Sequence, residues 1–403
     1  MLNVKTPEEA LAAVLNAFRY RTEGERVPLS GAAGRVLFSP VVSGEYVPDF
    51  DRSTVDGYAV RAADTFGCSE SIPALLRLTG AVRMGRAAET EVLPGCCAAI
   101  PTGGALPVGA DAAVMLEYAE DYGDGSVGIF RPAAPGMNLI RRGDDVSPGR
   151  ALLPAGRRLN APAIGALAAL GVADVEVCRK PKAGILSTGD ELVDASAVPG
   201  PGQVRDVNAP MLAALCAECG AKPRIYGIVP DDRASLGAAL DRAMAECDLV
   251  LLSGGSSVGA KDAAAEVLGA RGELLFHGIA MKPGKPTLAA NCGGKPVFGL
   301  PGHPVAAFFA ARLLVRPLLA QLLGETLREE TAEAVLTESV AANDGRALYL
   351  GVELRETAGV RYAVPIRAKS GLITALARAV GYLSIPRDRE GLAEGSAVRV
   401  TIL

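Results

Sequence analysis

The strongest constraint in this sequence is an alternation of short apolar runs and helical patterns between residues 182 and 325. The apolar runs have the length of strands, and the segments between them repeat apolar residues at helical spacing. The runs are 183–187, 224–229, 249–252 and 297–300, and the helical patterns are 209–219, 234–246, 262–269 and 304–323. This alternation predicts a parallel sheet with helices on both faces.

The flanking regions follow other patterns. Thr6 before Pro7, with Glu8 and Glu9 in the first turn, predicts a helix start. Short runs broken by Gly and Pro from 53 to about 143 predict a small β-rich unit, and a helix is expected around 161–170. After residue 325, strand-like runs without long helices predict a small β-barrel or sandwich, with strands at 334–340, 347–354, 360–365 and 397–403.

Composition excludes several classes of function. The 403 residues carry 41 Lys and Arg against 45 Asp and Glu, a net charge of −4, so we expect no nucleic-acid partner. No run of about 18 residues lacks both charges and helix breakers, so we expect no membrane span. His277 and His303 are the two histidines, which rules out a three-histidine metal site. Carboxylates, hydroxyls, lysines and backbone amides are left to carry any chemistry.

The eight cysteines are scattered through a long chain, which is unlike a disulfide framework. The N-terminal segment lacks the apolar core of a signal peptide, so we expect a reducing, cytoplasmic location. Cys216 and Cys219 have CxxC spacing, which is compatible with zinc or redox chemistry. They lie in a helical pattern with no second pair nearby, so packing in the core is the favoured interpretation.

Polar, glycine-rich turns follow the predicted strands, at 187–191, 230–232, 253–259, 282–286 and 299–304. Ligands bind outside the carboxyl ends of parallel strands, where glycines let backbone amides approach an anion. Glu191, Asp231 and Asp262 are expected to converge there, and three carboxylates beside such amides suit a Mg²⁺ ion that bridges phosphate oxygens.

Several polar residues of the chain also have a purely structural interpretation. Asp231 and Asp262 could cap the helices that follow them, and Asp56 before a glycine is a common turn residue. Lys282 and Lys285 could be solvated surface lysines, and Arg346 an ordinary residue beside a strand.

Three enzyme signatures match only partly. Residues 255–259 fit G-x-S-x-G with Ser257 as nucleophile, but the required acid and histidine are poorly provided downstream. Residues 278–285 resemble a P-loop with the wrong spacing, and Pro286 stands where Ser or Thr belongs. No G-x-G-x-x-G follows a predicted strand with an acidic partner, which disfavours a dinucleotide oxidoreductase.

Several motifs in order along the chain resemble those of the molybdopterin molybdotransferases, the molybdenum insertases that include the C-terminal domain of gephyrin. The first is Arg52-Ser-Thr-Val-Asp-Gly-Tyr-Ala59, similar to R-S-x-x-D-G-Y-A. The others are at 101–111, 186–192, 206–208, 253–262, 281–286 and 300–305. Together they span nearly the whole chain.

The resemblance implies an α/β multidomain fold with four domains. These are an extended helix and strand domain (1–45 and 143–180), an inserted β-rich domain (46–142), an α/β molybdopterin-binding domain (181–326) and a C-terminal β-barrel (327–403).

It also implies roles for individual residues. The implied catalytic residues are Asp56, Thr102, Asp145 (with Asp144 as an alternative), Glu191, Asp231 and Asp262. Glu191 and Asp262 would hold Mg²⁺. The implied phosphate and pterin cradle comprises Thr188, Gly189, Gly254, Gly255, Ser256, Ser257, Gly259, Lys285, Pro301 and Pro304. The implied molybdate ligands are Lys282, Arg346 and Ser370.

The implied reaction inserts molybdate into molybdopterin-AMP with Mg²⁺-dependent release of AMP. The implied assembly is a homodimer whose active site is shared, so that Asp56 acts on the α/β domain of the partner chain. Transient contacts with a molybdopterin adenylyltransferase and with apo-molybdoenzymes are also implied.

The chain departs from the family pattern at several positions. P-G-N-P becomes Pro301-Gly-His303-Pro, Ala306 replaces a frequent serine, and His277-Gly-Ile279 lacks a further basic residue. These changes bear on the molybdate pocket and on the choice between molybdate and tungstate, and His303 could supply a donor in place of Asn. Two rival functions stay open: a molybdopterin adenylyltransferase activity, and a non-enzymatic binding or scaffold role.

Overall fold

The computed structural model describes residues 4–254, 258–342, 345–367 and 369–403, with the backbone alone for 258–262. The chain divides into two compact units. The larger unit contains the chain up to Ser39, Ala155–Leu159 and Val175–Leu403, and the smaller unit contains Pro40–Pro154 and Asn160–Asp174. The four-domain boundaries expected from the sequence stay a prediction beside this division.

A six-stranded sheet forms the centre of the larger unit, in the order β16-β13-β17-β21-β20-β18. The first four strands are parallel, as expected, and β20 runs antiparallel to both of its neighbours, β21 and β18. The strands are β13 (Lys182–Thr188), β16 (Lys222–Val229), β17 (Leu249–Gly254), β18 (Glu273–His277), β20 (Leu288–Cys292) and β21 (Lys295–Leu300). The antiparallel edge arises because a tight turn at Gly293 and Gly294 joins β20 directly to β21.

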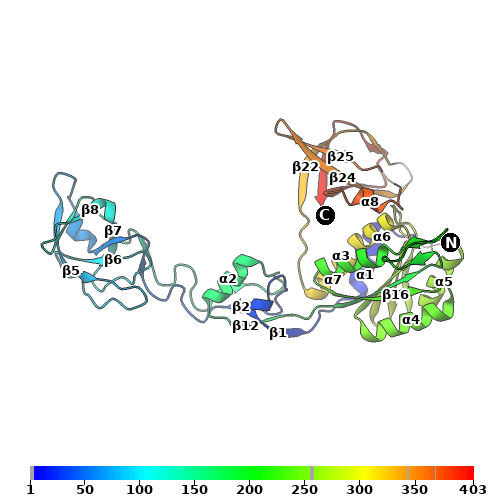
Figure 1. Cartoon of the computed structure of the whole chain (residues 1–403), viewed down its shortest axis with the longest axis horizontal. Helices are drawn as coiled ribbons and strands as arrows, with labels where there is room; N and C mark the ends of the chain where they lie inside the picture. The colour runs from blue at the N-terminus through cyan, green and yellow to red at the C-terminus, as the bar shows by residue number, and fades with distance from the viewer. Residues whose placement is uncertain (1–3, 255–257, 343–344, 368) are drawn as a thin grey trace. The chain divides into compact units, whose positions relative to one another are not determined.

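Alternate residues of β13, β17, β20 and β21 enter two different apolar clusters, one on each face of the sheet. On β13, Ala183 and Ile185 pack in one cluster and Leu186 in the other. One face is covered by α1 (Pro7–Ala17), α3 (Asn208–Glu218), α6 (Pro304–Ala310) and α7 (Arg316–Leu323). The other face is covered by α4 (Arg233–Glu246) and α5 (Val258–Gly269), and Figure 1 shows these two helices together on one side. The prediction of helices on both faces is confirmed.

Helix α1 begins as the sequence predicts. The Thr6 side chain accepts a hydrogen bond from the Glu9 amide, and the Glu9 carboxylate accepts one from the Thr6 amide. This reciprocal pair satisfies two amides that a helix start otherwise leaves open. Helix α2 (Ala161–Ala169), in the smaller unit, is capped in a similar way by the Asn160 side chain.

One helical run, Pro304–Leu323, is long and apolar enough to cross a membrane by length and composition. It consists of α6, a π-helical turn (Ala311–Val315) and α7. Phe309, Leu314, Leu318 and Leu322 on this run are buried in the core cluster beside α1 and α3. Burial of this kind is typical of a core helix, which accounts for its apolar character.

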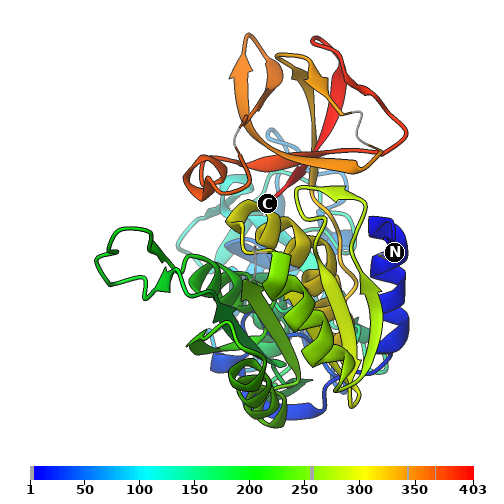
Figure 2. The ribbon, with the colours of Figure 1, turned by 90° about the vertical axis from the view of Figure 1, so that its right-hand side faces the viewer.

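The C-terminal residues form a closed five-stranded barrel, visible in orange and red in Figure 2. Its strands are β22 (Thr331–Leu336), β24 (Ala347–Thr357), β25 (Val360–Pro365), β26 (Gly381–Ile385) and β28 (Ala397–Ile402). The predicted strand 334–340 is interrupted: β22 ends at Leu336, and Val340–Ala341 forms β23, which pairs with β27 (Gly391–Leu392). Strand β19 (Met281–Lys282) of the preceding segment pairs with β24, and the short helix α8 (Ile373–Leu376) follows β25.

The smaller unit contains the expected β-rich sheet, in the order β7-β4-β6-β5-β9-β8. Its strands are β4 (Gly57–Val60), β5 (Ala74–Ala81), β6 (Cys96–Ile100), β7 (Ala112–Met115), β8 (Ala119–Asp121) and β9 (Ser126–Ile129). It also contains two two-stranded pairs, β2 (Val41–Val42) with β11 (Ala151–Leu153) and β3 (Arg52–Ser53) with β10 (Leu139–Ile140).

Two further two-stranded pairs belong to the larger unit, apart from the first residue of β12. They are β1 (Gly24–Pro28) with β12 (Asp174–Cys178), and β14 (Leu192–Val193) with β15 (Val204–Arg205).

Candidate functional site

The carboxyl ends of the four parallel strands lie level with one another. Thr188 at the end of β13 is in register with Val229 of β16 and with Gly254 of β17. Ser253 of β17 is in register with Leu300 of β21. The polar turns that follow these strands therefore leave the sheet at a common edge, which we call the carboxyl edge.

A hydrogen bond joins two of the predicted site residues at this edge. The Thr188 hydroxyl, buried at 3% exposure, donates to Asp231 Oδ1 at 2.8 Å. The interpretation of Asp231 as a helix cap is wrong, because Asp232 caps α4 by accepting from the Ala234 and Ser235 amides. Asp231 is therefore held by the neighbouring strand end.

Two glycines allow the strand ends to come together. Gly254 has φ +144°, and a Cβ on it would lie 1.9 Å from the Thr188 carbonyl oxygen. Gly189 has φ +150°, and a Cβ there would lie 2.8 Å from Glu191 Oε2. Both conformations strongly favour glycine. The exposed Glu191 side chain thus folds back over the Gly189 backbone, so its carboxylate stays at the carboxyl edge.

The turn after β17 is described in part. Gly255, Ser256 and Ser257 lie outside the described residues. Helix α5 begins at Val258, so its backbone contains Gly259 and Asp262, and the interpretation of Asp262 as a helix cap is wrong. The Asp262 side chain lies outside the described set. Among the side chains that the structure describes, no three His, Cys, Asp or Glu residues are grouped to hold a metal ion.

Asn208 is a site residue that the sequence interpretation missed. It is 6% exposed, and its Nδ2 donates both to Ser253 Oγ at 2.7 Å and to the Gly302 carbonyl oxygen at 2.8 Å. Asp206 positions it by accepting hydrogen bonds from the Asn208 and Ala209 amides at 3.1 Å. One amide group therefore connects the end of β17 with the loop before α6. The Asp206-Val-Asn208 motif was the signal that could have identified it.

The three predicted molybdate ligands lie in the larger unit, two of them as one pair of neighbours and the third, Ser370, paired with His303. Lys282 on β19 is in register with Leu348 of β24, which brings Lys282 close to Arg346, the residue directly before that strand. Ser370 Oγ lies 2.8 Å from His303 Nδ1, and the Ser370 carbonyl accepts from the Val305 amide at 3.0 Å.

The three remaining cradle residues lie near these pairs. The Lys285 carbonyl accepts from the Ile279 amide at 2.9 Å in the loop after β19. Pro301 is buried, and Pro304 is the first residue of α6.

The smaller unit carries the other three predicted catalytic residues. Asp56 Oδ1 accepts a hydrogen bond from the Thr102 amide at 2.8 Å, so the two turns that contain them are linked. A Cβ on Gly57 would lie 1.8 Å from the Val114 carbonyl oxygen, which explains the glycine after Asp56. Asp145 is exposed beside Asp144, whose carboxylate is engaged by the Arg141 amide at 2.7 Å.

The CxxC pair lies in the core of the larger unit. All eight cysteines are free thiols. Cys216 is fully buried among apolar residues, and Cys219 packs against the same cluster. Burial raises the pKa of Cys216 to about 12 and that of Cys219 to about 11, so both stay protonated near neutral pH. The prediction of core packing is confirmed.

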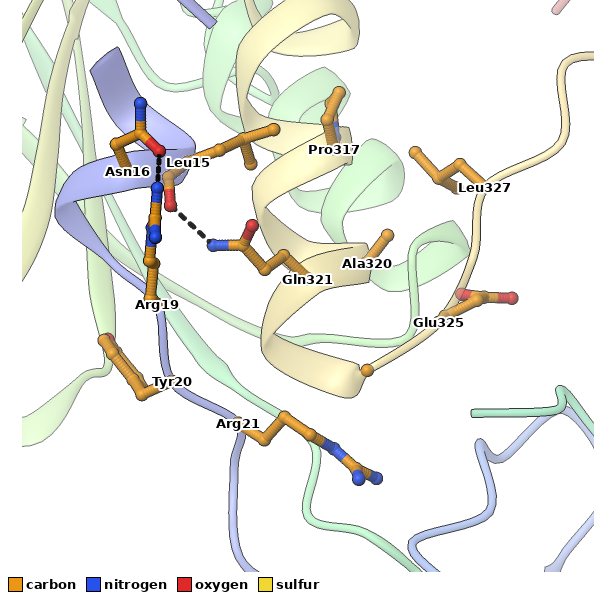
Figure 3. Close-up of a pocket in the computed structure, with 11 residues that line it drawn as sticks. Leu15, Asn16, Arg19, Tyr20, Arg21, Pro317, Ala320, Gln321, Glu325 and Leu327 are labelled. Carbon is orange, nitrogen blue, oxygen red and sulfur yellow. Dashed lines mark hydrogen bonds between the residues drawn. The ribbon is translucent and has the colours of Figure 1, made fainter. Parts of the chain in front are cut away.

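A pocket of about 710 Å³ lies between the end of α1 and α7 (Figure 3). Its polar side chains are already paired: Gln321 Nε2 donates to the Leu15 and Phe18 carbonyls, and Arg19 donates to Asn16. Burial, and then the nearby charge of Asp248, raise the pKa of Tyr20 in its wall. Asp248 directly precedes β17, so this pocket is near the amino ends of the strands, away from the carboxyl edge.

Comparison with known families accounts for this combination of elements. Residues 5–171 match the MoeA N-terminal region (domain I and II), 184–321 match a probable molybdopterin binding domain, and 333–403 match the MoeA C-terminal region (domain IV). The chain belongs to the MoeA family. The resemblance inferred from the motifs is therefore confirmed, and so is the expected multidomain fold.

Individual MoeA relatives align over nearly the whole chain. The chain is 34% identical to the molybdopterin molybdenumtransferase of Bacillus subtilis, covering 100% of this chain and 96% of that protein. It is 35% identical to molybdopterin molybdenumtransferase 2 of Mycobacterium tuberculosis, covering 99% of both. The crystal structure of the molybdopterin biosynthesis MoeA protein from Pyrococcus horikoshii OT3 matches with a TM-score of 0.88, 34% identity and full coverage of both chains.

Proposed function

We propose that this chain is a molybdopterin molybdotransferase, which inserts molybdate into adenylylated molybdopterin and releases AMP in molybdenum cofactor biosynthesis. The main support is the carboxyl edge of a MoeA-family sheet, where Thr188 holds Asp231 and two glycines let the backbone of the strand ends approach its neighbours closely. Glycine-rich turns and carboxylates at such an edge suit a phosphate-bearing substrate. The relatives named molybdopterin molybdenumtransferase support the same reaction.

We propose that the metal at this edge is Mg²⁺. Glu191 and Asp231 offer carboxylate oxygens, the hard donors that Mg²⁺ prefers. Neither acid forms an ion pair with a Lys or Arg within the described part of the chain. No basic side chain described there therefore competes with a metal ion for these two carboxylates. We propose Glu191 and Asp262 as the ligands, with Asp231 beside them. The ion would supply charge neutralisation at the phosphates.

The residues of the chain do the rest by binding and orientation. The cradle of Thr188, Gly189, Gly254, Gly255, Ser256, Ser257, Gly259, Lys285, Pro301 and Pro304 holds the phosphates and the pterin. Lys282, Arg346 and Ser370 hold molybdate as hydrogen-bond and charge partners of its oxygens. No nucleophilic side chain is needed, because the substrate brings its own sulfurs and proximity supplies much of the rate.

We further propose that the enzyme is a homodimer and that Asp56, Thr102 and Asp145 of one chain serve the carboxyl edge of its partner. The exposed Asp56–Thr102 turn of the smaller unit supports this role, because its carboxylate is oriented by a backbone amide while facing solvent. We also propose a cytoplasmic location, in keeping with eight free thiols, and transient contacts with a molybdopterin adenylyltransferase and apo-molybdoenzymes.

Release of AMP from molybdopterin-AMP tests the function directly. We expect release to require both molybdate and Mg²⁺, and to be abolished in Glu191→Ala while the circular dichroism spectrum is unchanged. Consumption of ATP with molybdopterin would indicate an adenylyltransferase instead, and binding of substrate without turnover would indicate a scaffold protein. Normal turnover by Glu191→Ala would remove the Mg²⁺ assignment.

The shared site has its own test. Neither Asp56→Ala nor Glu191→Ala protein should release AMP alone. Mixed dimers formed by subunit exchange should regain activity, because one of their two sites then contains both carboxylates. Exchange confirmed by native mass spectrometry without any recovery would contradict the proposal that Asp56 acts on the partner chain.

A further inference from the structure

His303 and Ser370 come together from two distant segments. His303 stands before the first residue of α6, and Ser370 lies in the loop between β25 and α8. Their side chains meet at 2.8 Å between Nδ1 and Oγ, and the Val305 amide fixes the Ser370 backbone at 3.0 Å. The contact is therefore held from both the backbone and the side chain.

The position of His303 offers it another role, capping α6, which it does not perform. It occupies the N-cap position, but its side chain makes no capping hydrogen bond to that helix. His303 is also exposed, so core packing does not account for it. Within the described part of the chain, the imidazole is committed to Ser370.

The number of hydrogens on Ser370 decides what this contact does. A serine hydroxyl has one hydrogen to donate, and fully ionised molybdate presents oxygens that can only accept. If Nδ1 accepted from Ser370, that hydrogen would be spent on the imidazole. If Nδ1 carries the hydrogen and donates, Ser370 keeps its own hydrogen for a second partner.

We propose that His303 is a positioning residue whose Nδ1–H donates to Ser370 Oγ and thereby directs the Ser370 hydroxyl hydrogen toward the bound oxyanion. This rests on the proposed role of Ser370 as a molybdate ligand. The directed hydrogen of Ser370 then meets an oxygen of the anion. All four oxygens of fully ionised molybdate can accept it, whereas one oxygen of hydrogen phosphate is itself protonated, so the directed donor favours molybdate over phosphate.

Equilibrium dialysis of the full chain with molybdate, in competition with inorganic phosphate, tests the proposal. We expect Ser370→Ala and His303→Leu each to weaken molybdate binding about tenfold, as expected for one hydrogen bond to a charged partner. The double variant should bind no more weakly than Ser370→Ala, because His303 acts through Ser370. His303→Asn can still donate an N–H, so it should retain most of the affinity.

Selectivity adds a readout that a purely structural role would leave unchanged. In His303→Leu the Ser370 hydrogen is no longer directed toward the anion, and the hydroxyl can rotate to accept from the O–H of hydrogen phosphate, so the preference for molybdate over phosphate should fall. His277→Asn, which removes the other imidazole, is the matched control and should bind as the parent does.

The possible failures are distinguishable. If Ser370→Ala binds molybdate normally, the proposed oxyanion site is wrong and the role of His303 is overturned with it. If Ser370→Ala weakens binding while His303→Leu does not, or if their effects add, the positioning role alone is overturned. His303→Asn and circular dichroism separate these results from a local folding defect.

Discussion

The carboxyl edge of the larger unit and the Asp56–Thr102 turn of the smaller unit each hold an acidic side chain in place, but with different groups. Each depends on a glycine against a carbonyl oxygen: Gly254 against Thr188, and Gly57 against Val114. At the carboxyl edge a buried hydroxyl holds the acid, whereas a backbone amide holds exposed Asp56. The first arrangement holds a partly buried acid at a strand end. The second holds an acid whose side chain is exposed to solvent.

The largest effect should come from adding a methyl group at either glycine. A Cβ would lie 1.9 Å from a backbone oxygen at Gly254 and 1.8 Å from one at Gly57. We expect Gly254→Ala and Gly57→Ala to cost about 3 kcal/mol or more in the free energy of unfolding, measured in urea. Gly293→Ala and Gly123→Ala, with positive φ but open space around them, should cost about 1 kcal/mol. If all four variants lost the same free energy of unfolding, the backbone around Gly254 and Gly57 would have room for a methyl group. The close glycine contacts would then not be a feature that the two regions share.

The neighbouring acids Asp231 and Asp232 separate chemistry from capping. Asn at 231 can still accept from Thr188 but carries no charge, so Asp231→Asn should lower AMP release about 10²-fold with little change in stability. Asp232→Asn should leave the rate unchanged and reduce stability modestly, because hydrogen bonds from the Ser235 side chain and amide lower the pKa of this capping acid. Slow AMP release by Asp232→Asn with normal release by Asp231→Asn would show that Asp232, the helix cap, is the acid that acts in the reaction.

Acid stability distinguishes two carboxylates that are each held by an arginine and a backbone amide. Burial raises the pKa of Asp248, but hydrogen bonds from Arg179 and the Lys182 amide outweigh it and lower the pKa overall. The Arg142 amide and then Arg141 lower the pKa of Asp51 in the smaller unit. A lowered folded-state pKa stabilises the fold above the unfolded value of about 4, and the benefit is lost as the pH falls through the folded value.

We therefore expect Asp248→Asn and Asp51→Asn to reduce stability at pH 7 and to flatten its loss in acid. The effect should be larger for Asp248, because both oxygens bond to Arg179 and its side chain is 24% exposed, against 33% for Asp51. Urea unfolding at a series of pH values measures this. A flatter acid profile for the Asp51 variant than for the Asp248 variant would contradict the ranking.

The smallest effect should come from the CxxC pair, which belongs to neither polar turn. Cys216→Ala with Cys219→Ala should release AMP at the parent rate, because both thiols are protonated and packed in the core. The protein should also contain no zinc by elemental analysis. If the double cysteine variant lost activity at unchanged stability, the result would support a redox or zinc role for the pair.

The main features of the fold were predictable from the sequence because they rest on local patterns. The Thr6 cap, the strand–helix alternation after residue 182 and the β-rich segments all follow from spacing and turn residues. Strands β18 and β20 were not predicted, because whether a short apolar segment joins a sheet edge depends on pairing with a distant strand. The break between β22 and β23 was missed for the same reason.

The candidate site was predicted less fully, since side-chain partners depend on the position of whole elements. The sequence could not say which of Asp231 and Asp232 caps α4, because that depends on where the helix begins. It also could not show that Asn208 reaches both Ser253 and Gly302, residues 45 and 94 positions away. Glycine positions were identified, but the carbonyl oxygens that require them were not.

Asn208 has a thermodynamic consequence for the loop before α6. Its NH₂ group has two hydrogens, one donated to Ser253 within β17 and the other to the Gly302 carbonyl. Displacing the loop from Asn208 therefore leaves one buried donor without its acceptor, which costs about 1–3 kcal/mol. Because the other hydrogen stays bonded to a strand of the central sheet, Asn208 anchors this loop to the sheet itself, and local opening of the loop should be correspondingly rare.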